Sequence, residues 1–337
     1  MLAAGMVIAL DAHSYQLAAP LAGSAYGLVW RAARIGGITG ERQVALKFVN
    51  QAQMAQAASG QRQRWVDGAV DEAAFLRQLA PWDARHIVRL LDSGVHDGLP
   101  ALALELMAGD LGAWVAQRRA AGQNGDIDRA FDWAGQVNQA LAKVHQYGRR
   151  HLDLKPSNLL LNDDGAIVKL ADFGTSRALL DEAPHVYAGT PNWQAPEQVF
   201  GEAADTDTDA AYRTSAATDY FALGALLYYL VTGGVALRFC RDAAQAWREG
   251  QLGAAARLRS RHRGAIPPTL SDEEAALFTQ RCGEAGMAVA ACRQALRLLR
   301  ELLAPDPRAR PPHALAIARM LAAIGAEVHT APAWSLA

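Results

Sequence analysis

The chain has 337 residues, of which 51% are hydrophobic and 20% are charged, and its formal net charge is −1. This composition excludes an intrinsically disordered protein, which would be poorer in apolar residues. The near balance of 33 Lys and Arg against 34 Asp and Glu argues against a dedicated nucleic-acid-binding protein, because such proteins carry a basic excess. The length suits one large domain or two medium ones.

The residues from 14 to 107 predict a strand-rich region that contains one helix. Alternating apolar residues around turns favour strands within 14–32 and 42–50, and residues 86–107 predict two strands joined by a His-Asp-Gly turn. Residues 70–80 carry apolar side chains at helical spacing and end before Pro81, which predicts a helix.

Helical patterns dominate the rest of the chain. Amphipathic spacing predicts helices over 126–147 and 288–303, and the acidic stretch 201–212 predicts a solvated loop. Residues 220–237 carry no charge and are about long enough to cross a bilayer. Because a helix that is apolar all round can also lie in a protein core, and because Gly233 and Gly234 interrupt this one, we expect a buried helix and no membrane association.

The cysteines and the first residues favour a cytoplasmic protein. An odd number of cysteines without a close pair fits reduced thiols, here Cys240, Cys282 and Cys292. The first ten residues are apolar but lack a basic flank, so we expect a first strand or a packed arm rather than a signal peptide.

Polar groups lie between apolar runs in two neighbouring segments, HLDLKPSNLLL at 151–161 and ADFGTSR at 171–177. Buried carboxylates require partners or a metal. The side-chain oxygens of Asn158 and Asp172 suit Mg²⁺, which takes few protein ligands and fills the rest of its coordination with water and phosphate. The two segments therefore predict a magnesium site.

These segments, with others in the same order, resemble the eukaryotic-type (Hanks-type) Ser/Thr protein kinases over residues 14–322, and the use of Ala and Arg suggests a bacterial member. VALKFVN resembles the strand with the phosphate-binding lysine, and DEAAFLRQL the αC helix. HLDLKPSN resembles the catalytic loop, DFG the magnesium loop and QAPE the end of the activation segment. TDYFALG resembles the start of the αF helix at Asp219, and PDPRARP contains Arg310, expected to pair with Glu197.

The resemblance implies an α+β, two-lobed protein kinase fold, in which an antiparallel sheet and the αC helix form the N-lobe and the C-lobe is mainly helical. We expect the N-lobe and hinge over 1–107, the C-lobe over 108–325 and a C-terminal tail over 326–337.

The resemblance also assigns catalytic roles. Asp153 is expected to accept the hydrogen bond of the substrate hydroxyl, and Lys155 to neutralise charge on the transferred phosphoryl group. Lys47 is expected to hold the α- and β-phosphates of ATP and to be held by Glu72, while Asn158 and Asp172 ligate Mg²⁺.

An ATP site follows from the same resemblance. It predicts a phosphate loop, an adenine pocket with gatekeeper Leu104, hinge residues that bond adenine through their backbone, and a ribose contact. The remaining residues are Leu21, Ala22, Gly23, Ser24 and Gly27 in the loop, Val29, Ala45 and Leu160 around the ring, Glu105 and Met107 in the hinge, and Asp110 at the ribose.

The sequence departs from the family at two places. Of the glycine-rich pattern, only Gly27 and Val29 remain, although Ala22 and Ser24 can still present their amides to phosphate if their φ is negative. Leu152 replaces the arginine that pairs with an activation-loop phosphate in the family, which predicts a non-RD kinase. We expect packing, with Tyr187 and Trp193 as anchors, to hold the activation segment instead.

Two alternatives remain open from the sequence. A pseudokinase that acts as a nucleotide-binding scaffold fits the degenerate glycines and the missing arginine. A small-molecule kinase of the aminoglycoside phosphotransferase type shares the Asp and Asn core but generally lacks the QAPE segment. The expected partners are ATP and a protein substrate, and the sequence leaves the substrate and the oligomeric state undetermined.

Overall fold

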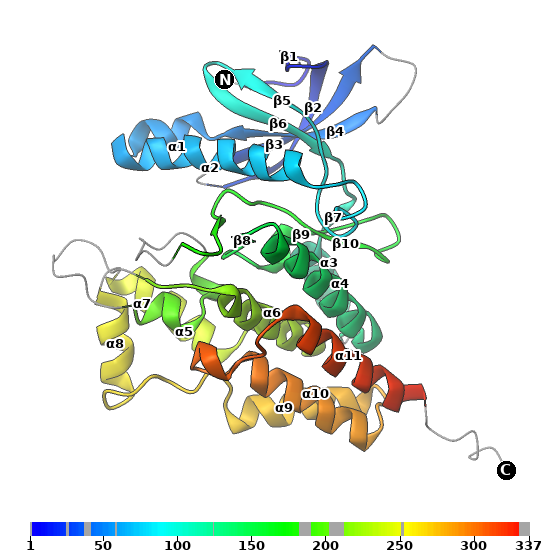
Figure 1. The fold of residues 1–337 in the computed structure, drawn as a ribbon, viewed down its shortest axis with the longest axis vertical. Helices are drawn as coiled ribbons and strands as arrows, with labels where there is room; N and C mark the ends of the chain where they lie inside the picture. Colours follow the sequence, from blue (N-terminus) through cyan, green and yellow to red (C-terminus); the bar gives the residue numbers. More distant parts are fainter. Residues whose placement is uncertain are drawn as a thin grey trace.

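The computed structural model describes residues 2–24, 27–36, 42–57, 59–123, 125–181, 190–201, 212–250 and 253–329. It has two lobes, a curled antiparallel sheet with helices at one side and a mainly helical body (Figure 1). The predicted α+β architecture is therefore confirmed.

The sheet of the first lobe has six antiparallel strands in the order β1-β2-β3-β4-β6-β5. The strands are β1 (Val7–Ala9), β2 (Ser14–Gly23), β3 (Gly27–Ile35), β4 (Gln43–Val49), β5 (Leu90–His96) and β6 (Leu99–Glu105). Alternate residues of β4 point to opposite faces, so Val44, Leu46 and Phe48 enter a small core while Ala45 and Lys47 face the other way. The first residues do contain a strand, as expected.

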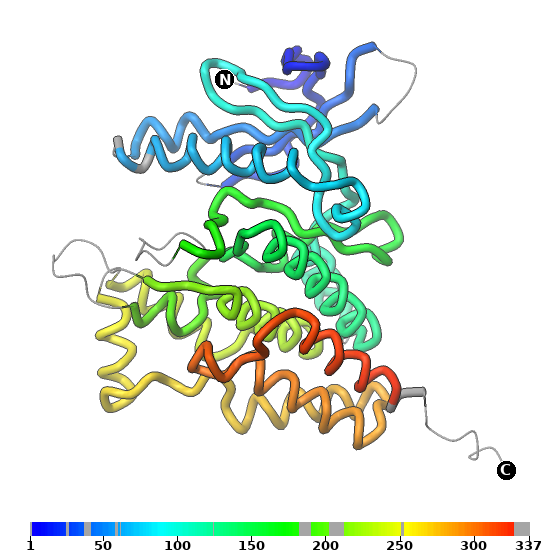
Figure 2. The backbone as a smooth tube through the Cα atoms, viewed as in Figure 1, coloured from blue at the N-terminus to red at the C-terminus, as the bar shows by residue number. Residues whose placement is uncertain are grey.

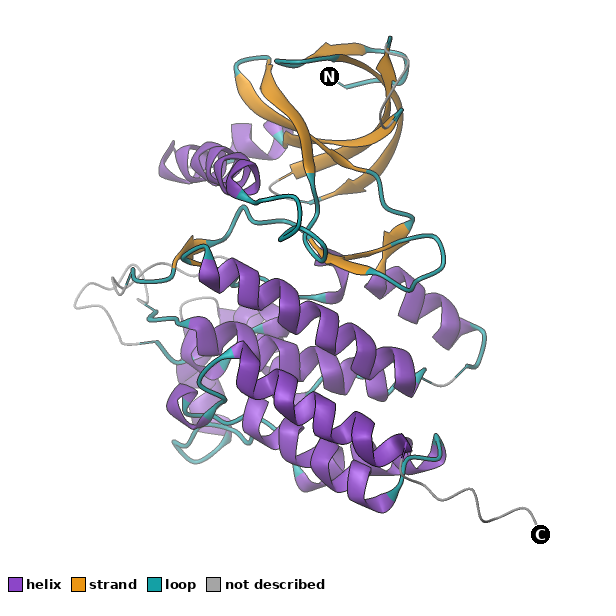
Figure 3. Cartoon of the chain, turned by 45° about the vertical axis from the view of Figure 1, so that its right-hand side comes forward, coloured by secondary structure: helices purple, strands orange, loops and turns teal. Residues whose placement is uncertain are grey.

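Helix α2 (Ser59–Gln78), which follows the short α1 (Gln51–Gln56), lies along one side of this sheet (Figure 3). It begins eleven residues before the start of the predicted helix at 70. Apolar periodicity could not reveal the first half, because the buried apolar side chains of α2 begin at Ala73 and continue with Phe75 and Leu76.

The second lobe is built from helices with short strands above them. The helices are α3 (Leu111–Ala120), α4 (Ile127–Gln146), α5 (Pro196–Val199), α6 (Ala216–Val231), α7 (Arg238–Gly250), α8 (Ala254–Arg261), α9 (Asp272–Glu284), α10 (Val289–Leu302) and α11 (Ala314–His329). The strands are β7 (Gly109–Asp110), β8 (Arg149–Arg150), β9 (Leu159–Leu161), β10 (Val168–Leu170) and β11 (Arg177–Ala178). Helices α4 and α10 match the predicted ranges.

Helix α6 runs through the middle of this lobe, and thirteen of its 16 residues are buried. Ser215 and Thr218 form a capping box at its start, and it ends before Gly233 and Gly234, which both have positive φ. The predicted buried helix is confirmed, although it begins at 216 and ends at 231. In the described part of the chain, no helix combines the length and the apolar character needed to span a bilayer.

Replacing Leu226 by Asp should unfold the protein, because Leu226 is fully buried in α6 and a carboxylate there would have no partner. We expect the free energy of unfolding to fall by about 4 kcal/mol or more, measured by denaturant titration. The matched control is Leu315→Asp, since Leu315 is 57% exposed at the start of α11. Equal effects of the two substitutions would contradict the central position of α6.

Candidate active site

Lys47 brings together one carboxylate from each lobe. Its Nζ lies 2.6 Å from Oε2 of Glu72 on α2 and 2.7 Å from Oδ1 of Asp172, which follows β10. The Glu72 side chain is 1% exposed and that of Lys47 is 18% exposed. The structure thus joins three residues that are 25 and 125 positions apart in the sequence.

Lys47 and Asp172 stabilise each other's charges, whereas burial and the neighbouring Asp172 raise the pKa of Glu72 against the opposing effect of Lys47. Burial acts to raise the pKa of Asp172, but the Lys47 ammonium outweighs it and lowers that pKa to about 2. Burial acts to lower the pKa of Lys47, and the two carboxylates reverse this, so the pKa of Lys47 is raised. At neutral pH Lys47 is a cation and Asp172 an anion.

The segment after Asp172 is packed against the underside of α2. The Phe173 amide donates to Oε1 of Glu72 at 3.2 Å, and the Phe173 ring lies 4.7 Å from Phe75 and 5.0 Å from His151. A Cβ added to Gly68 of α2 would lie 2.6 Å from the carbonyl oxygen of Gly174. In Figure 2 the green segment rises toward α2 at this point. The helix that carries Glu72 is therefore held directly on the loop that carries Asp172.

Asp153 is the centre of a second cluster, on the helical lobe. Its Oδ2 lies 2.7 Å from Nζ of Lys155, and its Oδ1 accepts the Thr190 amide at 2.9 Å. Lys155 also donates to Oγ1 of Thr190 at 2.5 Å. The amide nitrogen of Asn158 donates to the backbone carbonyl and to Oδ2 of Asp153. The side-chain oxygen is therefore the atom of Asn158 that could bind a cation.

Asp219 of α6 holds the backbone that presents Asp153. Its two carboxylate oxygens accept the amides of His151 at 2.9 Å and Leu152 at 2.8 Å, and Nε2 of His145 lies 2.9 Å from Oδ2. Leu152 has φ of 66°, a left-handed conformation that is unfavourable for a residue with a Cβ. The buried carboxylate offsets this cost because it satisfies two amides that the turn would leave unpaired.

Strand register gathers the predicted adenine-site residues. Ala45 pairs with Leu104, Val29 pairs with Lys47, and Leu160 pairs with Asp110. Each pair comes from neighbouring strands, so the residues of a pair lie side by side. Half-buried Met107 lies two residues after the end of β6, at the connection to the second lobe.

Two side chains in this region have structural partners. The Glu105 carboxylate binds Lys169 Nζ at 2.6 Å, the Arg89 amide at 2.9 Å and Arg89 Nε at 3.1 Å. The Glu105 backbone amide also donates to the Arg89 carbonyl at 3.0 Å, so a backbone contact with adenine would have to use the Glu105 carbonyl oxygen. Asp110 caps α3, since its Oδ1 accepts the Ala113 amide at 2.9 Å.

In the predicted phosphate loop, Ser24 just after β2 and Gly27 at the start of β3 are joined by hydrogen bonds. The Ser24 amide donates to the Gly27 carbonyl at 2.8 Å, and the Gly27 amide donates to Oγ of Ser24 at 3.1 Å. Asn50 donates to the Ser24 carbonyl at 2.7 Å. Neither Ala22 nor Ser24 has positive φ, but the Ser24 amide already donates to the Gly27 carbonyl, so it is engaged before any phosphate arrives. Exposed Leu21, Ala22 and Gly23 complete β2, and positions 25–26 lie outside the described residues.

The end of the activation segment is fixed by a buried ion pair. Arg310 donates from Nη1 and Nη2 to the two oxygens of Glu197, at 2.8 Å each, which confirms the predicted pair. Trp193 packs edge-on against Tyr229 of α6 at 5.4 Å, as expected of an anchor. The other predicted anchor, Tyr187, lies outside the described residues, as do positions 202–211 of the acidic insertion.

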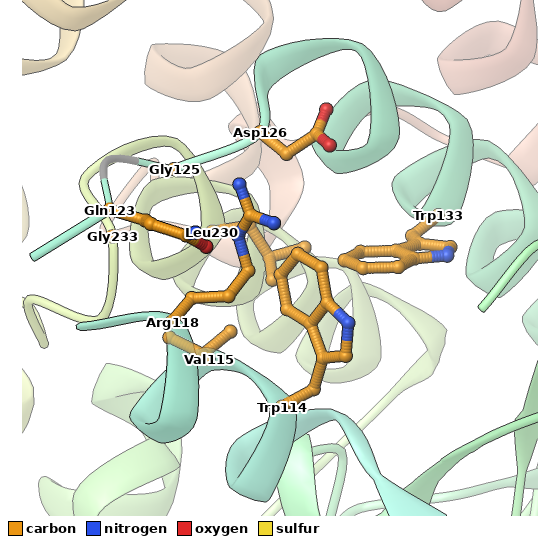
Figure 4. Close-up of a pocket in the computed structure, with 9 residues that line it drawn as sticks. All are labelled: Trp114, Val115, Arg118, Gln123, Gly125, Asp126, Trp133, Leu230 and Gly233. Carbon is orange, nitrogen blue, oxygen red and sulfur yellow. The ribbon is translucent and has the colours of Figure 1, made fainter. Parts of the chain in front are cut away.

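A small pocket lies in the helical lobe between α3, α4 and the end of α6 (Figure 4). The Arg118 guanidinium lies 4.7 Å above the Trp114 ring, which meets Trp133 edge-on at 4.9 Å. None of the predicted site residues lines this pocket, so it is separate from the site around Lys47 and Asp153.

Sequence reasoning missed four residues that support the site through hydrogen bonds or ion pairs. They are Asn50 at the phosphate loop, Lys169 behind the hinge, and the pair Arg150 and Asp181 near the activation segment. For Lys169 a signal was available, because it is one of only four lysines in the chain. The others depend on contacts between distant segments.

Comparison with known proteins agrees with this geometry. The family model for the protein kinase domain matches residues 25–320. The chain is 33% identical over 238 residues to the serine/threonine-protein kinase PkaA of Streptomyces coelicolor, covering 65% of this chain and 39% of that protein. It is 33% identical over 156 residues to Pkn1 of Myxococcus xanthus, covering 44% of this chain and 20% of that protein.

A third relative, the serine/threonine-protein kinase PknB of Mycolicibacterium smegmatis, is 36% identical over 110 residues, 31% of this chain and 16% of that protein. The matches therefore span 39% or less of the length of these three relatives. The chain belongs to the protein kinase family, and the predicted resemblance to Hanks-type kinases is confirmed.

Gly68→Ala should destabilise the protein although alanine favours a helix. The added Cβ would meet the Gly174 carbonyl, a backbone atom that cannot move aside without displacing the Asp172 loop. Gly60→Ala, in the same helix with no atom within 4 Å of the new Cβ, is the matched control and should raise the free energy of unfolding by up to about 1 kcal/mol. Denaturant titration measures both. Equal gains in stability would contradict the close packing of α2 on Gly174.

Proposed function

We propose that the protein is an ATP-dependent serine/threonine protein kinase of the non-RD type, which transfers the γ-phosphoryl group of ATP to a protein hydroxyl. The observation that carries this proposal is the pair of charged clusters that the fold assembles from distant segments. Lys47, Glu72 and Asp172 form one, and Asp153, Lys155 and Thr190 form the other. Phosphoryl transfer needs mainly alignment and charge neutralisation, and these clusters supply both.

The donor set fits Mg²⁺. Asp172 is an anion whose Oδ2 is not used by Lys47, and Asn158 offers its amide oxygen because its nitrogen is held by Asp153. Two oxygen ligands with the remaining positions left for water and phosphate are what Mg²⁺ takes in such sites. When bound, the ion would neutralise charge on the phosphate oxygens.

The chain's own residues have defined tasks in this proposal. The Lys47 ammonium, held by Glu72, binds the phosphates of ATP. The Asp153 carboxylate accepts the hydrogen bond of the attacking hydroxyl and directs it at the γ-phosphorus. Lys155, 2.7 Å from Asp153, stabilises the charge that develops on the transferred group. Val29, Ala45, Leu104 and Leu160 surround the adenine ring.

A serine or threonine substrate is favoured by the bridge between Lys155 and Thr190. By resemblance, a lysine two residues after the catalytic aspartate and a GTP motif before QAPE are typical of Ser/Thr kinases. Both residues also contact the carboxylate that we propose receives the substrate hydroxyl, since Lys155 Nζ lies 2.7 Å from Oδ2 of Asp153 and the Thr190 amide donates to Oδ1 at 2.9 Å. A cytoplasmic location is supported by three buried cysteines that are free thiols.

Lys47→Ala, Asp153→Ala and Asp172→Ala should each lower kcat by about two orders of magnitude or more, because each removes alignment or charge stabilisation. The assay measures transfer from labelled ATP with Mg²⁺ to a generic protein substrate. Asp272→Ala is the control, since Asp272 is exposed on α9. Wild-type activity in any of the three variants would contradict the assigned roles. ATP binding without transfer in the wild-type protein would indicate the scaffold function instead.

Thr190→Val should also be damaging, because it removes the hydroxyl that accepts the Lys155 hydrogen bond while it keeps the side-chain shape. We expect kcat to fall about tenfold or more, equivalent to about 1.4 kcal/mol in the barrier. Thr175→Val is the matched control and should be nearly neutral, since among the described residues its hydroxyl makes only a long 3.4 Å contact with the His151 carbonyl. Equal rates for the two variants would show that the Thr190 bridge has no role in catalysis.

A further inference from the structure

Arg150 is a cation buried beneath the start of the activation segment, two residues before Leu152. It is 1% exposed and lies on β8, where it pairs in register with Arg177 of β11. A buried arginine requires partners for its five donors. The sequence motifs assign Arg150 no role, since the family arginine of this loop would stand at position 152.

The partners of Arg150 come from the activation segment and from the residues just before α6. Its Nη2 donates to the backbone carbonyl of Asp181, in the segment, and its Nη1 donates to the carbonyl of Thr214, just before α6. The Asp181 carboxylate lies 2.5 Å from Nη2 of Arg177. Arg150 therefore joins the segment to the rigid helix at the centre of the lobe.

The charges here are unbalanced without Asp181. Two guanidinium groups are register partners, and within the described residues the Nε atoms of both are buried without a hydrogen-bond partner. Asp219 is the other nearby carboxylate, but its oxygens already bind the amides of His151 and Leu152. Burial and the neighbouring Arg177 both lower the pKa of Arg150, while Asp181 opposes this effect.

We infer that Asp181 is a permanent counter-ion for Arg150 and Arg177, which anchors the activation segment without phosphorylation. This inference rests on the proposed kinase function and adds Arg150 and Asp181 as positioning residues. Leu152 cannot bind a phosphate, and the carboxylate of Asp181 supplies the anion from the segment itself. Glu72 binds the Phe173 amide at the other end of this stretch. Residues 173–181 are therefore held at both ends.

The anchored stretch carries the strand that supports the catalytic loop. Strand β11 pairs with β8, and the Leu179 amide donates to the Gly148 carbonyl at 2.7 Å. Strand β8 leads directly into His151 and Asp153. Loss of the counter-ion would let two like charges repel across this strand pair and loosen the backbone that aims Asp153.

The test is Asp181→Asn, which removes the charge and keeps the shape. The matched control is Glu301→Gln, which removes the acid of an exposed i,i+4 arginine pair on α10. We expect Asp181→Asn to lower kcat about tenfold or more, with KM for ATP changed less than about twofold, because the contacts of Lys47 are untouched. Asp181→Glu should recover part of the loss. Wild-type kcat should be unchanged after phosphatase treatment confirmed by mass spectrometry.

A second readout does not depend on kinase activity. Hydrogen exchange of a peptide covering residues 174–181 should become faster in Asp181→Asn and stay unchanged in Glu301→Gln. If the wild-type protein transfers no phosphate, the proposed function fails, and faster exchange would still support the anchor. Unchanged exchange together with unchanged kcat in Asp181→Asn would overturn the inference. So would a tenfold loss of wild-type activity on dephosphorylation, since a phosphate would then be the anchoring anion.

Discussion

The ammonium group of Lys47, placed between the carboxylates of Glu72 and Asp172, is the interaction on which the rest of the site depends. One carboxylate comes from the helix beside the sheet and the other from a loop of the helical lobe. The Lys47 ammonium therefore links the two lobes. The close contact of Gly68 with Gly174 and the Phe173–Phe75 contact keep α2 near enough for this bridge to form. Removing one partner would leave an uncompensated charge in a buried setting, which is why the cluster acts as a unit.

Around this bridge, charged side chains stabilise backbone segments that have unfavourable conformations. Leu152 and Asp172 both have left-handed backbone conformations, with φ of 66° and 65°. Asp219 binds the amides next to the first, and Lys47 binds the side chain of the second. Because α6 is buried along nearly its whole length, Asp219 is fixed in position. Its bonds to the backbone just before Asp153 therefore restrict the movement of Asp153 as well. Arg150 and Arg310 act similarly on the two ends of the activation segment.

Much of the fold and of the site could be predicted because polar groups with costly burial occur at motif spacing. Asp153, Asn158 and Asp172 lie between apolar runs where packing explains them poorly, and the resemblance to kinases added Lys47 and Glu72. The structure gathers these residues in two clusters. The ion pair of Glu197 with Arg310 was predictable from the same resemblance. The first half of α2 was missed because it buries little apolar surface, so periodicity has nothing to detect there.

The sequence by itself determined the lobe architecture, the buried helix after Ser215 and the identity of the charged groups at the site, since each depends on local pattern or on motif order. Only the tertiary structure decided that Glu105 turns its carboxylate to Lys169, that the Ser24 amide bonds to the Gly27 carbonyl, and that Asp181 binds Arg177 through its carboxylate and Arg150 through its backbone carbonyl. These contacts join segments that have no fixed spacing in the chain or choose among several available hydrogen-bond partners. Which partner a polar group takes depends on the packing around it, and packing is a property of the folded chain rather than of any short stretch of it.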